Sequence, residues 1–191
     1  MGLGDTIRTL AQMPTLLKLK KGMVPRAPDV TDSFSARVEA NAVRFGQRPA
    51  IVFEGRTLTW SELNEEANRY AQYFKGQGLE RGDTVSLIME NRVEFLALLI
   101  GLNKLGVTIG LINTNLNGRP LAHCVNVTNS KKCIFGAEVA ARMEEVKAEL
   151  SLSEGEDYYV VADGDNAPSL NWAIDLDLSL IHISEPTRLE P

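Results

Sequence analysis

The chain has 191 residues, of which 44% are hydrophobic and 24% are charged. This composition is typical of a soluble globular protein and excludes a disordered, collagen-like or coiled-coil chain. The 20 Lys and Arg residues against 25 Asp and Glu give a net charge of −5. Because phosphate binding needs a basic face, we expect no nucleic-acid partner.

Several features bear on the cellular compartment. Cys124 and Cys133 lie in apolar stretches, which favours buried, reduced thiols over a disulfide. The longest apolar stretch, residues 95–112, is interrupted by three glycines, an asparagine and a lysine, so it does not predict a membrane span. The first positive charges follow the N-terminal apolar residues, unlike those of a signal peptide. We therefore expect a cytoplasmic protein.

The N-terminus is basic, although the chain as a whole is acidic. Residues 1–26 carry five Lys or Arg and a single Asp, and their leucines recur among the lysines. Such a segment either lies on an anionic membrane surface or packs as a helix on its own domain. Two prolines in residues 23–28 predict a linker. We expect residues 1–28 to form a segment distinct from the body of the protein.

The first elements of the body are predicted by periodicity and capping. Residues 31–45 have the spacing of a helix, and residues 50–53 and 57–59 read as a β-hairpin turning through Glu54-Gly55-Arg56. Thr59-Trp60-Ser61-Glu62 is a capping box, which begins a helix that stops at the glycines of residues 76–78. The apolar stripe expected on this helix is Leu63, Ala67, Tyr70, Ala71 and Phe74.

Strands and helices then alternate to residue 162. We expect buried apolar strands over residues 84–89, 107–112, 132–135 and 158–162, and helices over residues 92–105, 120–128 and 137–150. Asn91 is the expected cap of the helix over 92–105. Unbroken apolar strands in such an alternation indicate a mainly parallel sheet covered on both faces, so the predicted fold class is α/β.

The residues alone show no catalytic constellation. The sequence contains none of the common glycine-rich phosphate loops, nucleophile elbows or zinc-protease motifs. His123 is predicted on a helix without a nucleophile or carboxylate in a useful position. Glu65-Glu66 and Glu144-Glu145 are helical neighbours that point apart, so we expect solvated faces. The cysteines form no metal-binding pattern.

The last residues have a different character from the body. Residues 178–188 read LSLIHISEPTR, which resembles the conceptual translation of a common transposase sequencing adapter. We therefore expect residues 178–191 to be an artefactual tail that begins where the reading frame leaves the gene near Asp177; an amphipathic β-type tail is the alternative. On this interpretation residues 29–177 are a partial domain.

Several motifs carry a resemblance to a known family. They are the helix start at residues 57–63, the turn at Gly78–Asp83, Asn91, and the segment Gly101–Gly106. With them, the chain resembles the opening of the adenylate-forming enzymes, the acyl-CoA synthetase superfamily, from about residue 34 to 161. Ile112–Leu116 followed by Pro120–Cys124 resembles the fatty acid transport protein and very-long-chain acyl-CoA synthetase branch.

The resemblance implies an AMP-forming fatty acid–CoA ligase that uses ATP, Mg²⁺ and CoA. It also implies that residues 29–177 are the first, incomplete subdomain of the AMP-binding domain. The sequence leaves a homodimer open as a partner. The family's catalytic motifs have no counterpart in residues 1–177. We therefore assign no catalytic, cofactor-binding or metal-binding residue, expect the fragment to be inactive, and interpret Gly101–Gly106 as a helix end entering a strand.

A second hypothesis comes from a different class of protein. The chain would then be a complete, small α/β module that docks on a membrane or a partner through its basic N-terminus, without catalysis. A reading frame that continues beyond Asp177 into a Ser/Thr/Gly-rich phosphate loop favours the ligase. A natural stop codon there favours the module.

Overall fold

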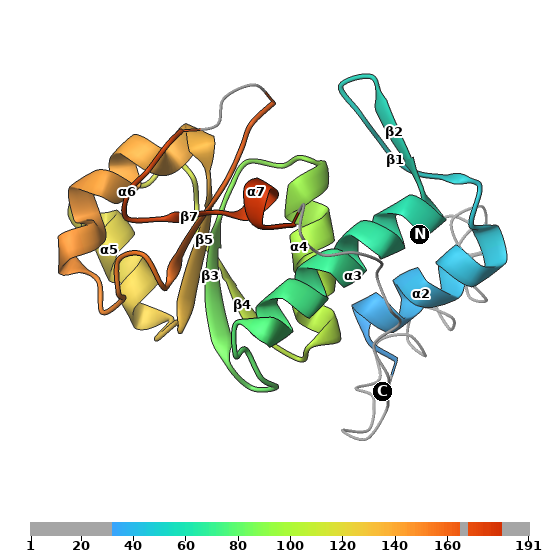
Figure 1. Cartoon of the computed structure of the whole chain (residues 1–191), viewed down its shortest axis with the longest axis horizontal. Coiled ribbons are helices and arrows are strands. Elements are labelled where there is room, and N and C mark those ends of the chain that lie inside the picture. The colour runs from blue at the N-terminus through green and yellow to red at the C-terminus, as the bar shows by residue number, and fades with distance from the viewer. Residues whose placement is uncertain (1–31, 165–167, 181–191) are drawn as a thin grey trace, which may run out of the picture. The chain divides into compact units, whose positions relative to one another are not determined.

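The computed structural model describes residues 32–164 and 168–180 (Figure 1). The expectations for residues 1–28 and for most of residues 178–191 lie outside this part of the chain. No helix in the described part is long and apolar enough to cross a membrane. The helices are α2 (Phe34–Phe45), α3 (Trp60–Gly76), α4 (Val93–Lys104), α5 (Gly118–Val127), α6 (Ala140–Val146) and α7 (Leu176–Leu180).

The predicted hairpin and capping box are both present. Strands β1 (Pro49–Phe53) and β2 (Arg56–Thr59) pair antiparallel through a two-residue turn. Glu54 and Gly55 have φ of 48° and 80°, which suits the primed turns that match strand twist. Thr59 then caps α3: the Glu62 backbone N–H donates to its Oγ1 at 3.3 Å, and its own N–H donates to Glu62 Oε2 at 2.8 Å. The whole predicted apolar stripe of α3 is buried.

The main sheet confirms the α/β fold class. It consists of β3 (Thr84–Ile88), β4 (Thr108–Leu111), β5 (Lys132–Gly136), β6 (Tyr158–Val161) and β7 (Ile174–Asp175). The strands lie in the order β4-β3-β5-β6-β7, and every neighbouring pair is parallel. Parallel pairing requires crossovers, and α4, α5 and α6 supply them as the sequence alternation predicts.

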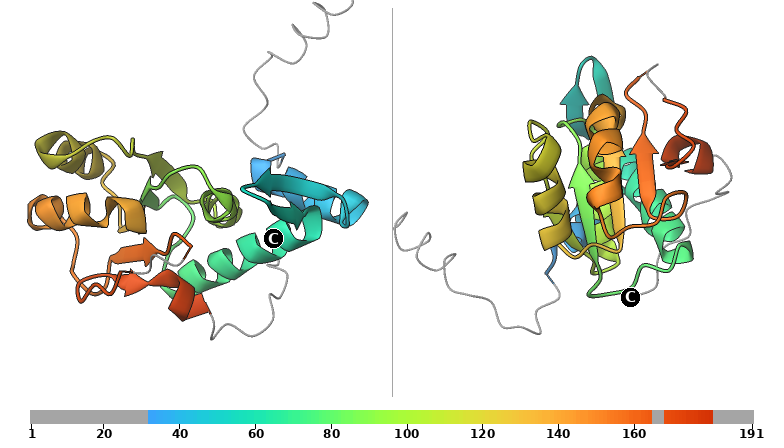
Figure 2. Two further views of the ribbon diagram at one scale, coloured as in Figure 1. Left: turned by 90° about the horizontal axis from the view of Figure 1, so that it is seen from above. Right: turned by 90° about the vertical axis from the view of Figure 1, so that its left-hand side faces the viewer.

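Alternation along the strands places a core on each face of the sheet. Val85 and Leu87 of β3 pack with α2, α3 and α4, whereas Ile88 packs with α5 and α6. The helices lie on opposite sides of the strands in Figures 1 and 2. Tyr158 and Tyr159 of β6 likewise point to different cores and are both fully buried. The sheet is therefore covered on both faces, as expected.

Two predictions for the second half of the chain are wrong. The stretch over 107–112 is not a second buried strand: β4 is an edge strand paired only with β3 among the described residues, and Leu111 is 56% exposed. The place of a strand in the sheet decides how far its residues are buried, even where the sequence of the strand is apolar. The helix expected over 137–150 is divided into a 3₁₀ turn (Ala137–Val139), α6 and a second 3₁₀ turn (Lys147–Glu149), and the first turn folds Glu138 back over the end of β5.

Candidate functional site

The order of the strands identifies the edge formed by their carboxyl ends as the candidate site. From β3 the chain crosses first to β4 on one side and then to β5 on the other. Ligands of open parallel sheets bind outside the carboxyl ends of the strands at such a reversal point. This carboxyl edge has two halves, one between β3 and β5 and one between β3 and β4.

The half between β3 and β5 is closed by the side chain of Arg92, which is only 8% exposed. Its Nη1 donates to Glu138 Oε2 at 2.8 Å. Its Nη2 donates to the carbonyl oxygens of Val161 and Ala162 at 3.2 and 3.1 Å. One guanidinium thus ties together the carboxyl ends of β3, β5 and β6.

Glu138 completes this closure. Its Oε1 accepts the backbone N–H of Glu90 at 2.8 Å, so the carboxylate bridges Arg92 and the end of β3. Burial alone would raise the pKa of Glu138, but the hydrogen bonds from Arg92 and from the Glu90 N–H outweigh it and lower the pKa. A Cβ on Gly136 would overlap the Glu138 carboxylate, so a larger residue at this position requires the carboxylate to move.

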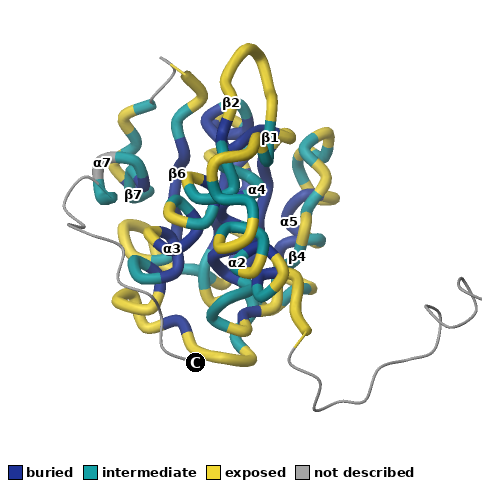
Figure 3. Tube along the Cα trace, turned by 90° about the vertical axis from the view of Figure 1, so that its right-hand side faces the viewer, coloured by how far each residue is buried: buried dark blue, intermediate teal, exposed yellow. Residues whose placement is uncertain are grey.

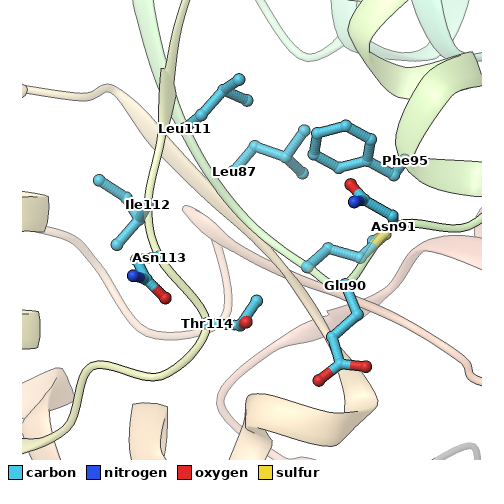
Figure 4. Close-up of a pocket in the computed structure, with 9 residues that line it drawn as sticks. Leu87, Glu90, Asn91, Phe95, Leu111, Ile112, Asn113 and Thr114 are labelled. Atoms are coloured by element: carbon cyan, nitrogen blue, oxygen red, sulfur yellow. The ribbon is translucent and has the colours of Figure 1, made fainter.

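The half between β3 and β4 is an open cleft of about 550 Å³ (Figure 4). Leu87, Phe95 and Leu111 supply apolar side chains, and Glu90 stands at the other end. The remaining lining residues are Met89, Asn91, Ile112, Asn113 and Thr114. An apolar floor with a few convergent amides and a hydroxyl is the ordinary composition of a binding cleft.

The loop after β4 forms a fixed wall of this cleft. Asn113 Oδ1 accepts the backbone N–H of Asn115 at 2.9 Å, and the carbonyl oxygen of Thr114 accepts a hydrogen bond from Arg142. The N–H of Ile112 donates to Leu87 O at 3.0 Å and continues the ladder with β3. These bonds hold Ile112–Leu116, one of the motifs singled out in the sequence, against the carboxyl end of the sheet.

The expected role of Asn91 is wrong. The cap of α4 is Arg92, in extended conformation and without a side-chain cap hydrogen bond. Because Arg92 must turn inward to reach Glu138, the helix starts one residue later than a cap at Asn91 requires. Asn91 instead lies exposed in the cleft, with its amide beside the ring of Phe95 (Figure 4). Asn91 and the segment Ile112–Leu116, two of the motifs that carry the resemblance, thereby line one cleft.

Carboxylates dominate the charge around this edge. Glu66 is not on a solvated face as expected: its side chain is 12% exposed and lies 3.6 Å from Arg56, which also donates to Glu94 at 2.6 Å. Burial raises the pKa of Glu66 more than Arg56 lowers it. Burial likewise raises the pKa of Asp177, which accepts the N–H of Ala162 at 2.8 Å.

The residues of the cleft do not fit the ATP, Mg²⁺ or CoA that the resemblance implies. The lining contains no lysine or arginine, and its one charged group is the Glu90 carboxylate, which repels polyphosphates. Within residues 32–164 and 168–180, no group of three His, Cys, Asp or Glu side chains is placed to hold a metal ion. No catalytic step is therefore assigned to these residues.

The other residues considered in the sequence lie away from the cleft. His123 is exposed on α5, and Glu65, Glu144 and Glu145 are exposed on their helices. Both cysteines are free; burial raises the pKa of the Cys133 thiol to about 12, whereas Cys124 is half-buried.

Gly101–Gly106 spans the end of α4 and its exit, as expected. Gly106 has a φ of 72°. A Cβ on Gly101 would lie 2.6 Å from Ala67 O, so Gly101 lets α4 pack closely on α3.

Comparison with known proteins gives one family match. The model for the AMP-binding enzyme family matches residues 38–180. Over 117 residues the chain is 38% identical to Long-chain fatty acid transport protein 1 of Bos taurus, covering 60% of the chain and 18% of the relative. Over 142 residues it is 27% identical to Medium/long-chain-fatty-acid–CoA ligase FadD6 of Mycobacterium tuberculosis, covering 74% and 24%. The chain thus spans about a fifth of the length of these relatives.

Solved structures agree on the fold. The anthranilate CoA ligase AuaEII in complex with anthranoyl-AMP superposes with a TM-score of 0.73 at 21% identity, over 87% of this chain and 31% of that one. A Mycobacterium tuberculosis fatty acyl CoA synthetase gives 0.65 at 23% identity, over 82% and 30%. The described fold is therefore that of a part of such enzymes.

Proposed function

The chain belongs to the AMP-binding enzyme family, and from this premise we propose that it is the N-terminal part of a long- or very-long-chain fatty acid–CoA ligase. Such a ligase converts a fatty acid, ATP and CoA into acyl-CoA, AMP and pyrophosphate through an acyl-adenylate. Mg²⁺ would supply charge neutralisation at the phosphates. The observation that carries the proposal is the 38% identity with a relative named for long-chain fatty acid transport.

The proposed contribution of this segment is a scaffold. Arg92 and Glu138 lock the carboxyl ends of three strands, and the lining of the cleft beside them contains no lysine or arginine to neutralise phosphate. We propose that the groups that bind nucleotide and perform the chemistry belong to further chain and that residues 1–191 alone are inactive. The purified chain, given palmitate, ATP, Mg²⁺ and CoA, should release no AMP above background. Turnover would contradict the proposed inactivity.

The origin of the chain provides a separate test. Sequencing the source transcript beyond the codon of Asp177 should reveal a continuing frame that encodes a Ser/Thr/Gly-rich phosphate loop. A stop codon directly after Asp177 would reject the ligase fragment and favour the small non-catalytic module.

We also propose that the protein is cytoplasmic and contacts anionic membranes peripherally through residues 1–26, which carry five basic residues. Co-sedimentation with vesicles containing phosphatidylserine should fall when residues 1–26 are removed and when salt is raised. Binding that is unchanged by this deletion would reject the proposal.

A further inference from the structure

The outer end of the β1–β2 hairpin is tied to the body of the protein by the side chain of Arg56. Residues 52–57 of the hairpin are all exposed, whereas Leu58 at its base is buried (Figure 3). From the outer end, Arg56 Nη1 donates to Glu94 Oε1 at 2.6 Å, and Nη2 lies 3.6 Å from Glu66 Oε2. Because a two-stranded hairpin alone is only marginally stable in water, the position of this end depends on Arg56.

Glu94 lies between the hairpin and the closed half of the carboxyl edge. It belongs to the first turn of α4, and its side chain is 19% exposed. While Oε1 accepts the hydrogen bond from Arg56, Oε2 lies 3.6 Å from Nε of Arg92, which is too far for a hydrogen bond. One carboxylate thus faces two guanidiniums and is hydrogen-bonded only to the one on the hairpin.

The second guanidinium has one donor that is not satisfied. Arg92 Nη1 and Nη2 donate to Glu138 and to two carbonyl oxygens, but its Nε is buried and has no hydrogen-bond acceptor within the described residues. A buried donor without an acceptor costs free energy. The terminal torsion of a glutamate is soft, so rotation of the Glu94 carboxylate would supply this acceptor at the expense of the bond from Arg56.

We infer that Glu94 is a two-position switch that couples the hairpin to the closed half in opposite directions. In one position it binds Arg56 and holds the outer end of the hairpin, and Arg92 Nε stays unpaired. In the other position it binds Arg92 Nε and strengthens the contacts at the strand ends, and Arg56 keeps only Glu66. Because both positions use the same carboxylate, a change that draws Arg56 away from Glu94 stabilises the closed half.

The exposure of the two arginines decides which position a change in salt concentration favours. The side chain of Arg56 is 51% exposed, so dissolved ions screen its attraction for Glu94. The side chain of Arg92 is 8% exposed, and its attraction for the same carboxylate is screened much less. A higher salt concentration should therefore move Glu94 from the hairpin to the closed half.

Nuclear magnetic resonance of the full chain tests the switch at the Nε–H of Arg92. Exchange of this proton with water slows when it gains an acceptor, and its signal moves downfield. Arg56→Gln should slow this exchange about threefold and should make the backbone amides of residues 52–57 exchange about tenfold faster. The matched control is Arg119→Gln, which changes an exposed arginine on α5 and should alter neither rate.

Removal of the shared carboxylate separates a switch from a general loosening of the fold. Glu94→Ala should free the hairpin amides without slowing exchange at Arg92 Nε, and Arg56→Gln added to it should leave the Arg92 signal unchanged. Raising the salt from about 0.05 M to about 0.5 M should slow the Arg92 exchange in the parent but not in Glu94→Ala. An Arg92 signal that ignores Arg56→Gln, or that responds equally without Glu94, overturns the proposal.

Discussion

The two halves of the sheet's carboxyl edge share one strand and differ in almost everything else. Between β3 and β5, Arg92 and Glu138 bridge the reversal point with a largely buried ion pair and three further strand-end hydrogen bonds. Between β3 and β4, apolar side chains and amides line an open cleft. The protein's own side chains thus bridge the strand ends between β3 and β5, whereas an open cleft lies beside them between β3 and β4.

Removal of the Arg92 guanidinium should have the largest effect. Arg92→Met leaves the Glu138 carboxylate and two carbonyl oxygens without the guanidinium that donates to them. We expect the free energy of unfolding, measured in urea, to fall by about 4 kcal/mol. Arg119→Met, a change at an exposed arginine on α5, is the control and should cost less than about 0.5 kcal/mol. Equal effects would mean that the closed half contributes nothing to stability.

A methyl group under Glu138 should open the same half by displacing the carboxylate of the ion pair. Gly136→Ala forces the carboxylate away from Arg92, and we expect a loss of about 2 kcal/mol. The matched control is Gly76→Ala at the end of α3, where an added Cβ meets nothing within 4 Å and stability should hold or rise. If both variants melt at the parent temperature, Gly136 is not needed beneath the carboxylate.

The charge of Glu138 should make the closed half sensitive to acid. Its pKa is lowered in the folded state, so its contribution is complete above the ordinary value of 4.5 and is lost as pH falls through the folded pKa. At pH 7 we expect Glu138→Gln to cost about 1.5 kcal/mol in urea unfolding. Below pH 4.5 the gap between parent and variant should shrink; a gap independent of pH would show that the carboxylate charge is unimportant.

The smallest effect is expected in the open half. Asn91→Ala removes a side chain that neither caps α4 nor reaches the core, so the free energy of unfolding should change by less than about 0.3 kcal/mol. Thr59→Ala, at the true cap of α3, should cost about 1 kcal/mol and provides the scale. A loss at Asn91 comparable to that at Thr59 would assign it a structural role.

Local signals determined much of the fold. The Thr59–Glu62 capping box and the Glu54–Gly55 turn act through neighbouring backbone groups, so they could be predicted without tertiary information. The α3 stripe and the alternation of apolar strands with helices were equally visible, because periodicity reports burial. The family resemblance also followed from short motifs.

The site could not be predicted in the same way. Nothing near Arg92 in the sequence marks it as buried, because its partners are Glu138 and the end of β6. Asn91 resembles a helix cap, and only the inward turn of Arg92 moves the helix start past it. Glu66 resembles a solvated residue until the hairpin brings Arg56 alongside.

The sequence by itself determined the α/β class, the start of α3, the hairpin turn and membership of a family, since these follow from periodicity and from short local motifs. Tertiary structure alone decided which strand is an edge, which half of the carboxyl edge is closed, and which carboxylates are buried. These properties depend on strand order and on pairs more than forty residues apart, such as Arg92 with Glu138. Packing, and not local propensity, fixes such pairs.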